Sequence, residues 1–547
     1  MSQLKALFAF SITTLLPAQF LQLGTTRDGS KVAFSSSLSL KSSTRNDNQK
    51  IYELSAAGLL RTLRDVSPVI LYPGDRAPSN FPILTKPEYD SAGSILAFTG
   101  TRWCIGGSGC IGVELTQGTV VWLDGSREAP HSGTVRISAN GKWAVYANPT
   151  SLVSPYRFYR VNLETGWNEF SATGLSGAAT AGRRVVANDG TVVSVPGART
   201  LTVRKPGQRD ATIPLSFSTS FVTISNDASF AIAQTTEEHP YFWLVDLYTQ
   251  QQIPFLWAAE GVSQPALSDD GMTLLFLSAA NFAGTNDSLA VQVWTMDMIT
   301  GHLRQWTTEP FGISEATISG DGLIVWATTR DGRLVRVDGL SGITEPFLQS
   351  SPQVNAAEYT TWAPGSRYRF EGAGLNSVSL SWQGLAVPIV NQAAESLEFI
   401  VPWEAATGSG AFEIDVADSP FQPLRITGEM RAVAPQFIKT AGFIHALRQD
   451  LSPLTVATPA RPGETVTLLM RGLGPVDSQG RTLQPSTVFS SAFPSIEIVS
   501  SEVDLGTPGT YRLAIRVPAI TEGPLTLFVR GPGDENAADS GLLPVEP

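Results

Sequence analysis

The sequence is poor in charge, in cysteine and in long hydrophobic runs, and each shortage excludes a class of protein. Charged residues make up 16% of the 547 residues and the net charge is −11, whereas a charged share of about 25% is usual. No cluster of lysine and arginine offers the basic face that nucleic acid or an anionic membrane surface requires. No segment reaches the roughly 18 apolar residues of a transmembrane helix. The sequence therefore predicts an acidic protein with no nucleic-acid partner and no membrane span.

The N-terminus has the order of an export signal. Lys5 precedes an apolar run from Ala6 to Leu16, and the small residue Ala18 follows this run. The run is too short to span a bilayer but has the length of the hydrophobic region of a signal peptide. We therefore expect residues 1–18 to be a signal peptide and the mature chain to be secreted, periplasmic or held at the cell surface. The alternative is a buried first strand.

Cysteine is nearly absent. Cys104 and Cys110 are separated by a glycine-rich segment that can fold back and bring the two sulfurs together. An isolated pair of this kind favours a disulfide in an oxidising compartment. A metal site would need more ligands than two thiols. Reduced, buried thiols are the alternative.

Glycine and proline are abundant instead, with 49 and 36 residues. Long stretches contain little lysine or glutamate, which favour helices. The composition therefore favours strands joined by tight turns. The length of the chain predicts roughly two to four domains.

A short repeat recurs through residues 1–350. Each copy has a polar turn, usually Asp-Gly or Asn-Gly, followed by a short apolar strand such as Lys31–Phe34. Glycine accepts the positive φ that a type I′ hairpin turn needs. The seven turns contain Asp28-Gly29, Ala92-Gly93, Asn140-Gly141, Asp189-Gly190, Asp227-Ala228, Asp270-Gly271 and Asp321-Gly322. Their spacing is close to that of propeller blades, which is about 40 to 50 residues.

Most of these turns are followed by an aromatic-rich strand that ends in an acidic or polar turn. The clearest copies are Phe158–Gly166, Phe242–Thr249, Val293–Gly301 and Leu334–Gly342. Two hairpins in each unit make a four-stranded sheet, which is one blade of a β-propeller. Most of the aromatic side chains are then expected to pack between neighbouring blades.

This pattern resembles the TolB-like and WD40-like propellers of bacterial envelope proteins over residues 20–350. The resemblance implies a β-propeller at residues 19–350 with seven blades, and counts of six or eight stay open. A strand from residues 20–26 is a candidate to complete the last blade. The resemblance implies a fold and no activity, because propellers host many unrelated functions.

The repeat then stops, and short strands punctuated by Pro-Gly turns take its place. A Pro-Gly turn followed by a strand, and later a strand that ends in Val-Pro, both occur twice. These elements are Ala363–Phe370, Leu397–Pro402, Ala460–Met470 and Leu513–Pro518. The duplication predicts two β-sandwich modules, at residues 351–433 and 434–547, with the size and strand spacing of immunoglobulin-like domains.

This tail resembles a C-terminal domain family that closes many large, uncharacterised secreted proteins of soil bacteria. The residues that carry the resemblance are Val354–Ala357, Ala363–Gly365, Val401–Glu404, Ala434–Phe437, Ala460–Glu464 and Gly472–Pro475. The chain departs from the family at Lys439–Gly442, where a Gly-rich turn is usual. No activity is established for the family, so the resemblance implies only export and a binding or attachment role.

No catalytic motif can be recognised. The sequence contains no His-Glu-x-x-His pair, Gly-x-Ser-x-Gly elbow, P-loop or EF-hand loop. Gly107–Gly112 matches Gly-x-Gly-x-x-Gly but opens no helix, so it cannot offer a helix N-terminus to a pyrophosphate. No cofactor and no metal are therefore expected.

One set of residues forms a candidate binding loop, because its members lie near the predicted inner strands and their connections. The set is Arg102, Trp103, His131, Glu237, Glu238 and His239. Three functions are open: a binding and display scaffold whose loop face holds a glycan, peptide or protein; a carbohydrate-active hydrolase or lyase with carboxylates converging on the propeller channel; and a structural part of an envelope complex.

Overall fold

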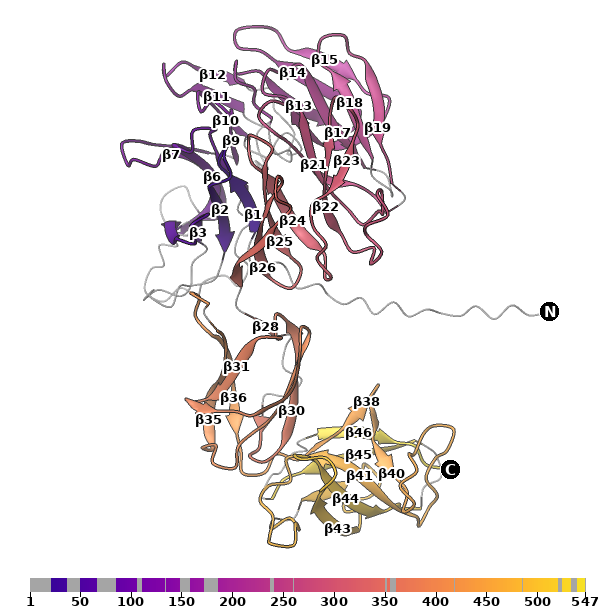
Figure 1. Cartoon of the computed structure of the whole chain (residues 1–547). Helices are drawn as coiled ribbons and strands as arrows, with labels where there is room; N and C mark the ends of the chain where they lie inside the picture. Colours follow the sequence, from indigo (N-terminus) through magenta and orange to yellow (C-terminus); the bar gives the residue numbers. More distant parts are fainter. Residues whose placement is uncertain are drawn as a thin grey trace, which may run out of the picture. The chain divides into compact units, whose positions relative to one another are not determined.

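The computed structural model of the chain is built from β-strands throughout the residues that it describes. These are residues 21–36, 50–65, 85–105, 111–132, 134–147, 158–171, 185–236, 241–258, 260–349, 352–354, 361–417, 419–484, 486–519, 524–532 and 539–546. The chain divides into two compact units, residues 1–350 and 351–547 (Figure 1). The prediction of an all-β protein is confirmed.

Among the described residues, the first unit contains seven antiparallel sheets, each made of strands that follow one another in sequence. Sheet 1 has β1 (Leu21–Thr25), β2 (Lys31–Ser36), β3 (Lys50–Ser55) and β4 (Leu60–Asp65). Sheet 2 has β5 (Thr85–Tyr89), β6 (Ile95–Ile105), β7 (Ile111–Trp122) and β8 (Glu128–Ser132). Sheet 3 has β9 (Thr134–Ile137), β10 (Trp143–Ala147), β11 (Phe158–Asn162) and β12 (Asn168–Ser171). Sheet 4 has three strands, β13 (Val192–Gly197), β14 (Thr200–Arg204) and β15 (Ala211–Pro214).

The remaining three sheets of this unit are again four-stranded. Sheet 5 has β16 (Thr219–Ile224), β17 (Phe230–Thr235), β18 (Phe242–Asp246) and β19 (Gln252–Leu256). Sheet 6 has β20 (Ser263–Leu267), β21 (Thr273–Ser278), β22 (Gln292–Asp297) and β23 (Leu303–Gln305). Sheet 7 has β24 (Ile313–Ile318), β25 (Ile324–Thr329), β26 (Arg333–Asp338) and β27 (Thr344–Gln349).

Sheets 1 and 7 lie against each other, and this contact closes the seven sheets into a β-propeller. The Leu23 N–H in β1 donates to Glu315 Oε1 in β24 (2.9 Å), and the Trp326 indole N–H donates to the Gly29 carbonyl (3.0 Å). β1 pairs with β2 inside sheet 1, so the expectation that residues 20–26 complete the last blade is wrong. The strand pairs with the segment that follows it, because a short loop is the least costly to close.

In the six four-stranded sheets, the Asp-Gly turn or its equivalent joins the first and second strands; in sheet 4, Asp189-Gly190 precedes β13, and Val186 before the turn forms a bridge to Val192 in β13. In sheet 1, Gly29 adopts a φ of 64° and donates its N–H to the Thr26 carbonyl, and the Thr26 N–H donates to the Lys31 carbonyl. The Asp28 carboxylate accepts the Ser30 N–H (3.0 Å) and the Thr26 hydroxyl (2.8 Å). The loop is therefore longer than a two-residue hairpin. The type I′ expectation is wrong because the aspartate side chain holds a wider turn.

The turn glycines also touch the neighbouring sheet. A Cβ added at Gly190 in sheet 4 would lie 2.7 Å from the ring of Trp143 in sheet 3. A Cβ added at Gly29 would lie 2.4 Å from Ile324 Cβ in sheet 7. Glycine is therefore needed at these turns for the close approach of two sheets as well as for the positive φ.

Polar side chains join the inner strands of neighbouring sheets. The Ile137 N–H of sheet 3 donates to Glu88 Oε2 of sheet 2 (3.2 Å), and the Gln264 side-chain amide of sheet 6 donates to the Ser314 carbonyl of sheet 7 (3.1 Å). The bond between Leu23 and Glu315 repeats this arrangement at the closure of the ring. These side-chain hydrogen bonds satisfy backbone N–H and carbonyl groups that are not paired within their own sheets.

Aspartates also organise the turns between the third and fourth strands. Asp246, Asp297 and Asp338 each accept two backbone N–H groups of their own turn. These hydrogen bonds favour the carboxylate form and hold the pKa of each aspartate below its ordinary value. The turns are therefore most stable while the three carboxylates are ionised.

Replacing all three aspartates by asparagine is expected to reduce the loss of folding stability at acid pH. Because the folded pKa lies below the unfolded pKa, the stabilisation is fully present above about pH 4 and is lost as the pH falls through the folded values. Asparagine keeps an acceptor but does not titrate. Between about pH 4 and pH 2, the unfolding temperature of the triple variant should fall less than that of the unchanged protein. Identical profiles would show that these carboxylates contribute nothing.

The described part of the second unit forms two sandwiches, each made of two sheets. The first sandwich pairs β28 (Gln353–Val354), β30 (Arg367–Ala373), β34 (Ser396–Ile400) and β33 (Ile389–Ala393) in one sheet. Its other sheet has β29 (Thr361–Trp362), β36 (Leu424–Met430), β35 (Gly408–Val416), β31 (Val378–Trp382) and β32 (Leu385–Ala386). The second sandwich pairs β37 (Gln436–Phe437), β40 (Ala446–Leu447), β41 (Thr465–Arg471), β44 (Tyr511–Arg516) and β43 (Ile498–Val503). Its other sheet has β38 (Lys439–Thr440), β39 (Phe443–Ile444), β46 (Asp539–Leu543), β45 (Leu525–Arg530) and β42 (Thr487–Phe489).

The duplicated sequence elements meet in the same way in both sandwiches. The Gly365 N–H of the first Pro-Gly turn donates to the Val401 carbonyl (2.7 Å), and the Gly463 N–H of the second donates to the Val517 carbonyl (2.8 Å). Each Pro-Gly turn is thus bonded to the Val-Pro end of the neighbouring strand. The repeated sequence elements correspond to repeated structure, while an immunoglobulin-like topology stays a prediction.

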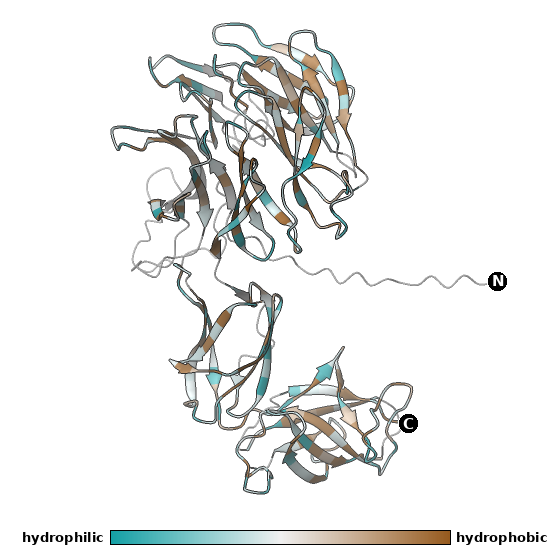
Figure 2. Cartoon of the chain, viewed as in Figure 1, coloured by the Kyte–Doolittle hydropathy of each residue, from teal (hydrophilic) through white to brown (hydrophobic). Residues whose placement is uncertain are grey.

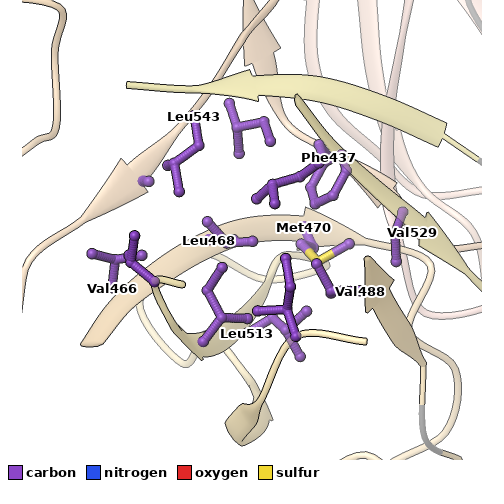
Figure 3. Packing of buried hydrophobic residues seen from close by; sticks show 14 of the residues in the cluster. Phe437, Val466, Leu468, Met470, Val488, Leu513, Val529 and Leu543 are labelled. Atoms are coloured by element: carbon purple, nitrogen blue, oxygen red, sulfur yellow. The ribbon is translucent and has the colours of Figure 1, made fainter. Parts of the chain in front are cut away.

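Each sandwich encloses a hydrophobic core between its two sheets. Along β41 the side chains of Val466, Leu468 and Met470 are buried and alternate with less buried residues. Figure 3 shows these three side chains packed with Phe437 and Leu513. The alternation of hydrophobic and hydrophilic residues along the strands can be followed in Figure 2, and it is the pattern of strands with one face in a core.

Candidate functional sites at the two ends of the propeller

The propeller has two different ends, because neighbouring strands run in opposite directions. The loop face is the end at which the second and fourth strands of the four-stranded sheets finish. The turn face is the opposite end. It carries the Asp-Gly turns and the turns between the third and fourth strands.

Three of the candidate binding residues share one sheet. Arg102 and Trp103 lie in β6 and His131 lies in β8, all near the ends of these strands at the loop face. β7 runs between β6 and β8, with Arg102 opposite Leu115 and His131 opposite Gly118. The backbone therefore gathers these three residues on sheet 2.

The other candidates lie outside the described residues. Glu237, Glu238 and His239 follow β17, and Cys110 lies between β6 and β7. Cys104 is in β6, and the two strands are paired as far as Ile105 and Ile111. The disulfide and a binding loop made of all the candidate residues stay predictions.

The inner strands surround a small polar cavity with a volume of about 70 Å³. Six sheets contribute to its wall, through Leu23, Glu88, Arg136, Thr223, Ala266 and Thr317. The cavity is far smaller than the roughly 300 to 1,000 Å³ of pockets that bury small-molecule ligands. It has room for a few water-sized groups.

A buried arginine dominates the electrostatics of this cavity. Burial lowers the pKa of the Arg136 guanidinium, and the Glu88 carboxylate raises it. Thr223 is fully buried, and its hydroxyl has no hydrogen-bond partner among the described residues. A cation, a carboxylate and a hydroxyl around a small cavity are groups that can hydrogen-bond ordered water.

At the loop face, sheets 6 and 7 present two exposed apolar side chains on adjoining segments. Leu289 lies between β21 and β22 and is 54% exposed, and Phe311 precedes β24 and is 40% exposed. Their next residues are in contact, since a Cβ added at Gly312 would lie 3.6 Å from Ala290 Cβ. The two exposed side chains therefore stand on adjoining segments of this face.

Leu289 adopts a backbone conformation that is rare for its residue type. Its φ is 50°, and the left-handed region costs a non-glycine residue about 1–2 kcal/mol. Buried Asn286 holds the loop in place, because its side-chain amide donates to the carbonyls of Ala279 (2.9 Å) and Ala290 (3.0 Å). Strain that is kept at an exposed side chain is a reason to look for a function there.

The sequence carries little signal for this pair. Leu289 follows Asn286, Asp287 and Ser288, which read as an ordinary polar turn. A single apolar residue in such a loop is common and needs no explanation by itself. The positive φ and the neighbouring Phe311 become visible only in three dimensions.

Neither a metal-binding cluster nor a membrane-spanning helix occurs in the described ranges. No group of three or more His, Cys, Asp or Glu side chains in these ranges could hold a metal ion. In the same part of the chain, no helix is long and apolar enough to cross a membrane.

Comparison with solved structures finds several proteins of low sequence identity. TolB from Acinetobacter baumannii matches over 59% of this chain and 65% of its own, with 13% identity and a TM-score of 0.35. The β-propeller domain of the Trilobed protease from Pyrococcus furiosus matches over 61% of this chain and 98% of its own, with 12% identity and a TM-score of 0.42. An oligogalacturonate lyase from Vibrio parahaemolyticus matches over 59% of this chain and 92% of its own, with 13% identity and a TM-score of 0.38.

The match thus spans less than two thirds of the TolB chain. No protein-family model matches the sequence. No curated protein matches it either. The assignment of residues 21–349 to the β-propeller class rests on the seven sheets and their closure, and the family predicted for the tail stays a prediction.

Proposed function

We propose that this protein is an exported binding and display scaffold whose propeller holds a peptide or protein partner at its loop face. The observation that carries the proposal is the strained, exposed Leu289 beside Phe311. An aliphatic and an aromatic side chain together suit the apolar side chains of a protein better than the hydroxyls of a glycan. Export rests on the signal peptide expected at residues 1–18, and the two sandwiches serve as a spacer or attachment.

The cavity between the inner strands gives less support to a polysaccharide-cleaving enzyme. Glu88 and Glu315 are the carboxylates of these inner strands, and each accepts a backbone N–H from the neighbouring sheet. Both therefore have a structural role in joining sheets. The cavity volume of about 70 Å³ is also small for a sugar ring. A place in an envelope complex would use the same loop-face surface with a permanent partner.

Leu289→Asn is expected to weaken partner binding without weakening the fold. Asparagine tolerates the left-handed region better than leucine, so the free energy of unfolding should stay the same or rise by up to about 1 kcal/mol. A photo-crosslinking amino acid at position 311 should give one discrete adduct with an envelope protein. The same group at exposed Leu505 in the second sandwich should give none.

The two readouts separate function from structure. The adduct at position 311 should fall at least roughly tenfold when Leu289→Asn is added. If Leu289→Asn instead destabilises the protein by more than about 1 kcal/mol, the side chain has a packing role. An adduct that Leu289→Asn leaves unchanged would contradict the loop-face proposal.

A further inference from the structure

The turn face carries a separate apolar surface on sheets 5, 6 and 7. The turns between the third and fourth strands, here called the outer turns, present Tyr248, Ile299 and Leu340 in these sheets. The three side chains are 66%, 76% and 80% exposed. The Asp-Gly turns of sheets 6 and 7 add Met272 and Leu323, which are also exposed. We name these five side chains the apolar row. Exposed apolar groups gathered on one face mark interaction sites.

The Asp-Gly turns, here called the inner turns, adjoin the outer turns within each of these sheets. The Met298 N–H donates to the Met272 carbonyl in sheet 6, and the Gly339 N–H donates to the Leu323 carbonyl in sheet 7, each at 2.8 Å. Met272 therefore lies beside the turn that carries Ile299. Leu323 likewise lies beside the turn of Leu340, so in sheets 6 and 7 the two exposed apolar residues stand on adjoining turns.

Sheet 3 shows that the turn fold does not require apolar residues at these positions. Its inner and outer turns are joined by the same hydrogen bond, from the Leu163 N–H to the Lys142 carbonyl (2.7 Å). Here the two positions hold Lys142 and Glu164, whose side chains form an exposed ion pair with Nζ and Oε2 3.2 Å apart. The apolar residues of sheets 6 and 7 therefore need a reason other than folding.

A groove opens between sheets 6 and 7 within the apolar row. Leu323 and Leu340 line it, together with Asp297 and Trp306, and its volume is about 200 Å³. The Arg304 guanidinium lies 5.4 Å from the Trp306 ring centre and donates to a backbone carbonyl (2.5 Å). The groove thus has an apolar wall, and Asp297, His302 and Arg304 are also among its lining residues.

Carboxylates accompany the apolar row along its length. Asp246, Asp297 and Asp338 stand two residues before its three outer-turn side chains; Asp297 is exposed, and Asp246 and Asp338 are half-buried. One cation already uses this surface, because Lys205 Nζ lies 5.2 Å from the Tyr248 ring centre. A partner that pairs apolar groups with positive charge would match both features.

We infer that the apolar row docks a protein segment whose apolar side chains are flanked by lysine or arginine. An apolar side chain of that segment fills the groove between Leu323 and Leu340, and its cations face the turn carboxylates. This site goes beyond the proposed function, because it lies at the opposite end of the propeller from Leu289. The propeller would then join two partners, one at each face.

The test uses the purified full chain and a fluorescein-labelled peptide of alternating leucine and lysine, with binding followed by anisotropy. Leu323→Lys with Leu340→Glu reproduces the ion pair of sheet 3 and should preserve the fold. This double variant is expected to lose at least roughly tenfold in affinity. Lys142→Ser with Glu164→Ser changes the matching positions of sheet 3 and should bind like the unchanged protein.

Three results would overturn the inference. The first is equal binding of a peptide with glutamate in place of lysine, since the carboxylates should repel it. The second is unchanged peptide affinity in the double variant. The third is a dimer that this variant converts to a monomer in sedimentation, which would make a second copy the occupant. Leu289→Asn should leave peptide binding unchanged, so failure at one face is distinguishable from failure at the other.

Discussion

Gly29→Ala is expected to destabilise the propeller by about 3 kcal/mol, because the new methyl group has no room at the closure of the ring. The added Cβ would lie 2.4 Å from Ile324 Cβ and 2.7 Å from two further Ile324 carbons. Overpacking of this kind costs roughly 1–3 kcal/mol. The positive φ of 64° adds about 1 kcal/mol. The propeller transition in calorimetry should therefore move to lower temperature.

Gly58→Ala is the matched control in the same sheet. Gly58 also has a positive φ, 80°, but nothing lies within 4 Å of an added Cβ. We therefore expect only the conformational cost, about 1 kcal/mol. Equal losses for the two variants would show that Gly29 does not lie against Ile324, and the closure of the ring would have to be placed elsewhere.

Arg160→Ala is expected to cost about 3–5 kcal/mol, since it breaks a buried polar centre between sheets 3 and 4. The Arg160 side chain is fully buried and donates to the carbonyls of Gly190 (2.7 Å) and Arg204 (3.0 Å). It also pairs with Glu169. Without the guanidinium, two carbonyls and one carboxylate lose their partner. Chemical denaturation of the full chain measures the loss.

Lys142→Ala, in the same sheet, provides the comparison. Lys142 and Glu164 form an ion pair in which both side chains are about half exposed, so its removal should cost less than about 1 kcal/mol. The loss of stability caused by Arg160→Lys should lie between those caused by Arg160→Ala and Lys142→Ala, because an ammonium cannot reproduce the forked geometry of the guanidinium. A loss for Arg160→Ala as small as that for Lys142→Ala would contradict the burial of this group.

The sequence alone was a good guide where the chemistry is local. An Asp-Gly turn such as Asp270-Gly271, and the alternating strand that contains Val466, Leu468 and Met470, are set by residues within a few positions of each other. Such patterns predicted strands, turns and the repeat of hairpins. The turn type was predicted less well, because the carboxylate of Asp28 bonds to Ser30 and Thr26 and widens the loop.

The candidate sites were harder to predict. The sequence predicts a binding loop around Arg102, His131 and His239, because these residues lie near the predicted inner strands and their connections. Nothing in the local pattern separates Leu289 from any other apolar residue in a polar loop. Its importance depends on a backbone angle and on Phe311, which precedes the first strand of the next sheet.

The sequence by itself determined that this protein is an all-β chain of repeated hairpins with an acidic surface, because composition, turn chemistry and strand alternation act over short distances. Only the tertiary structure decided how the ring closes, through Gly29 against Ile324, and which arginines, such as Arg136 and Arg160, are buried. It also decided which exposed side chains share a face. Each of these depends on residues from different sheets, which become neighbours only once the propeller has formed.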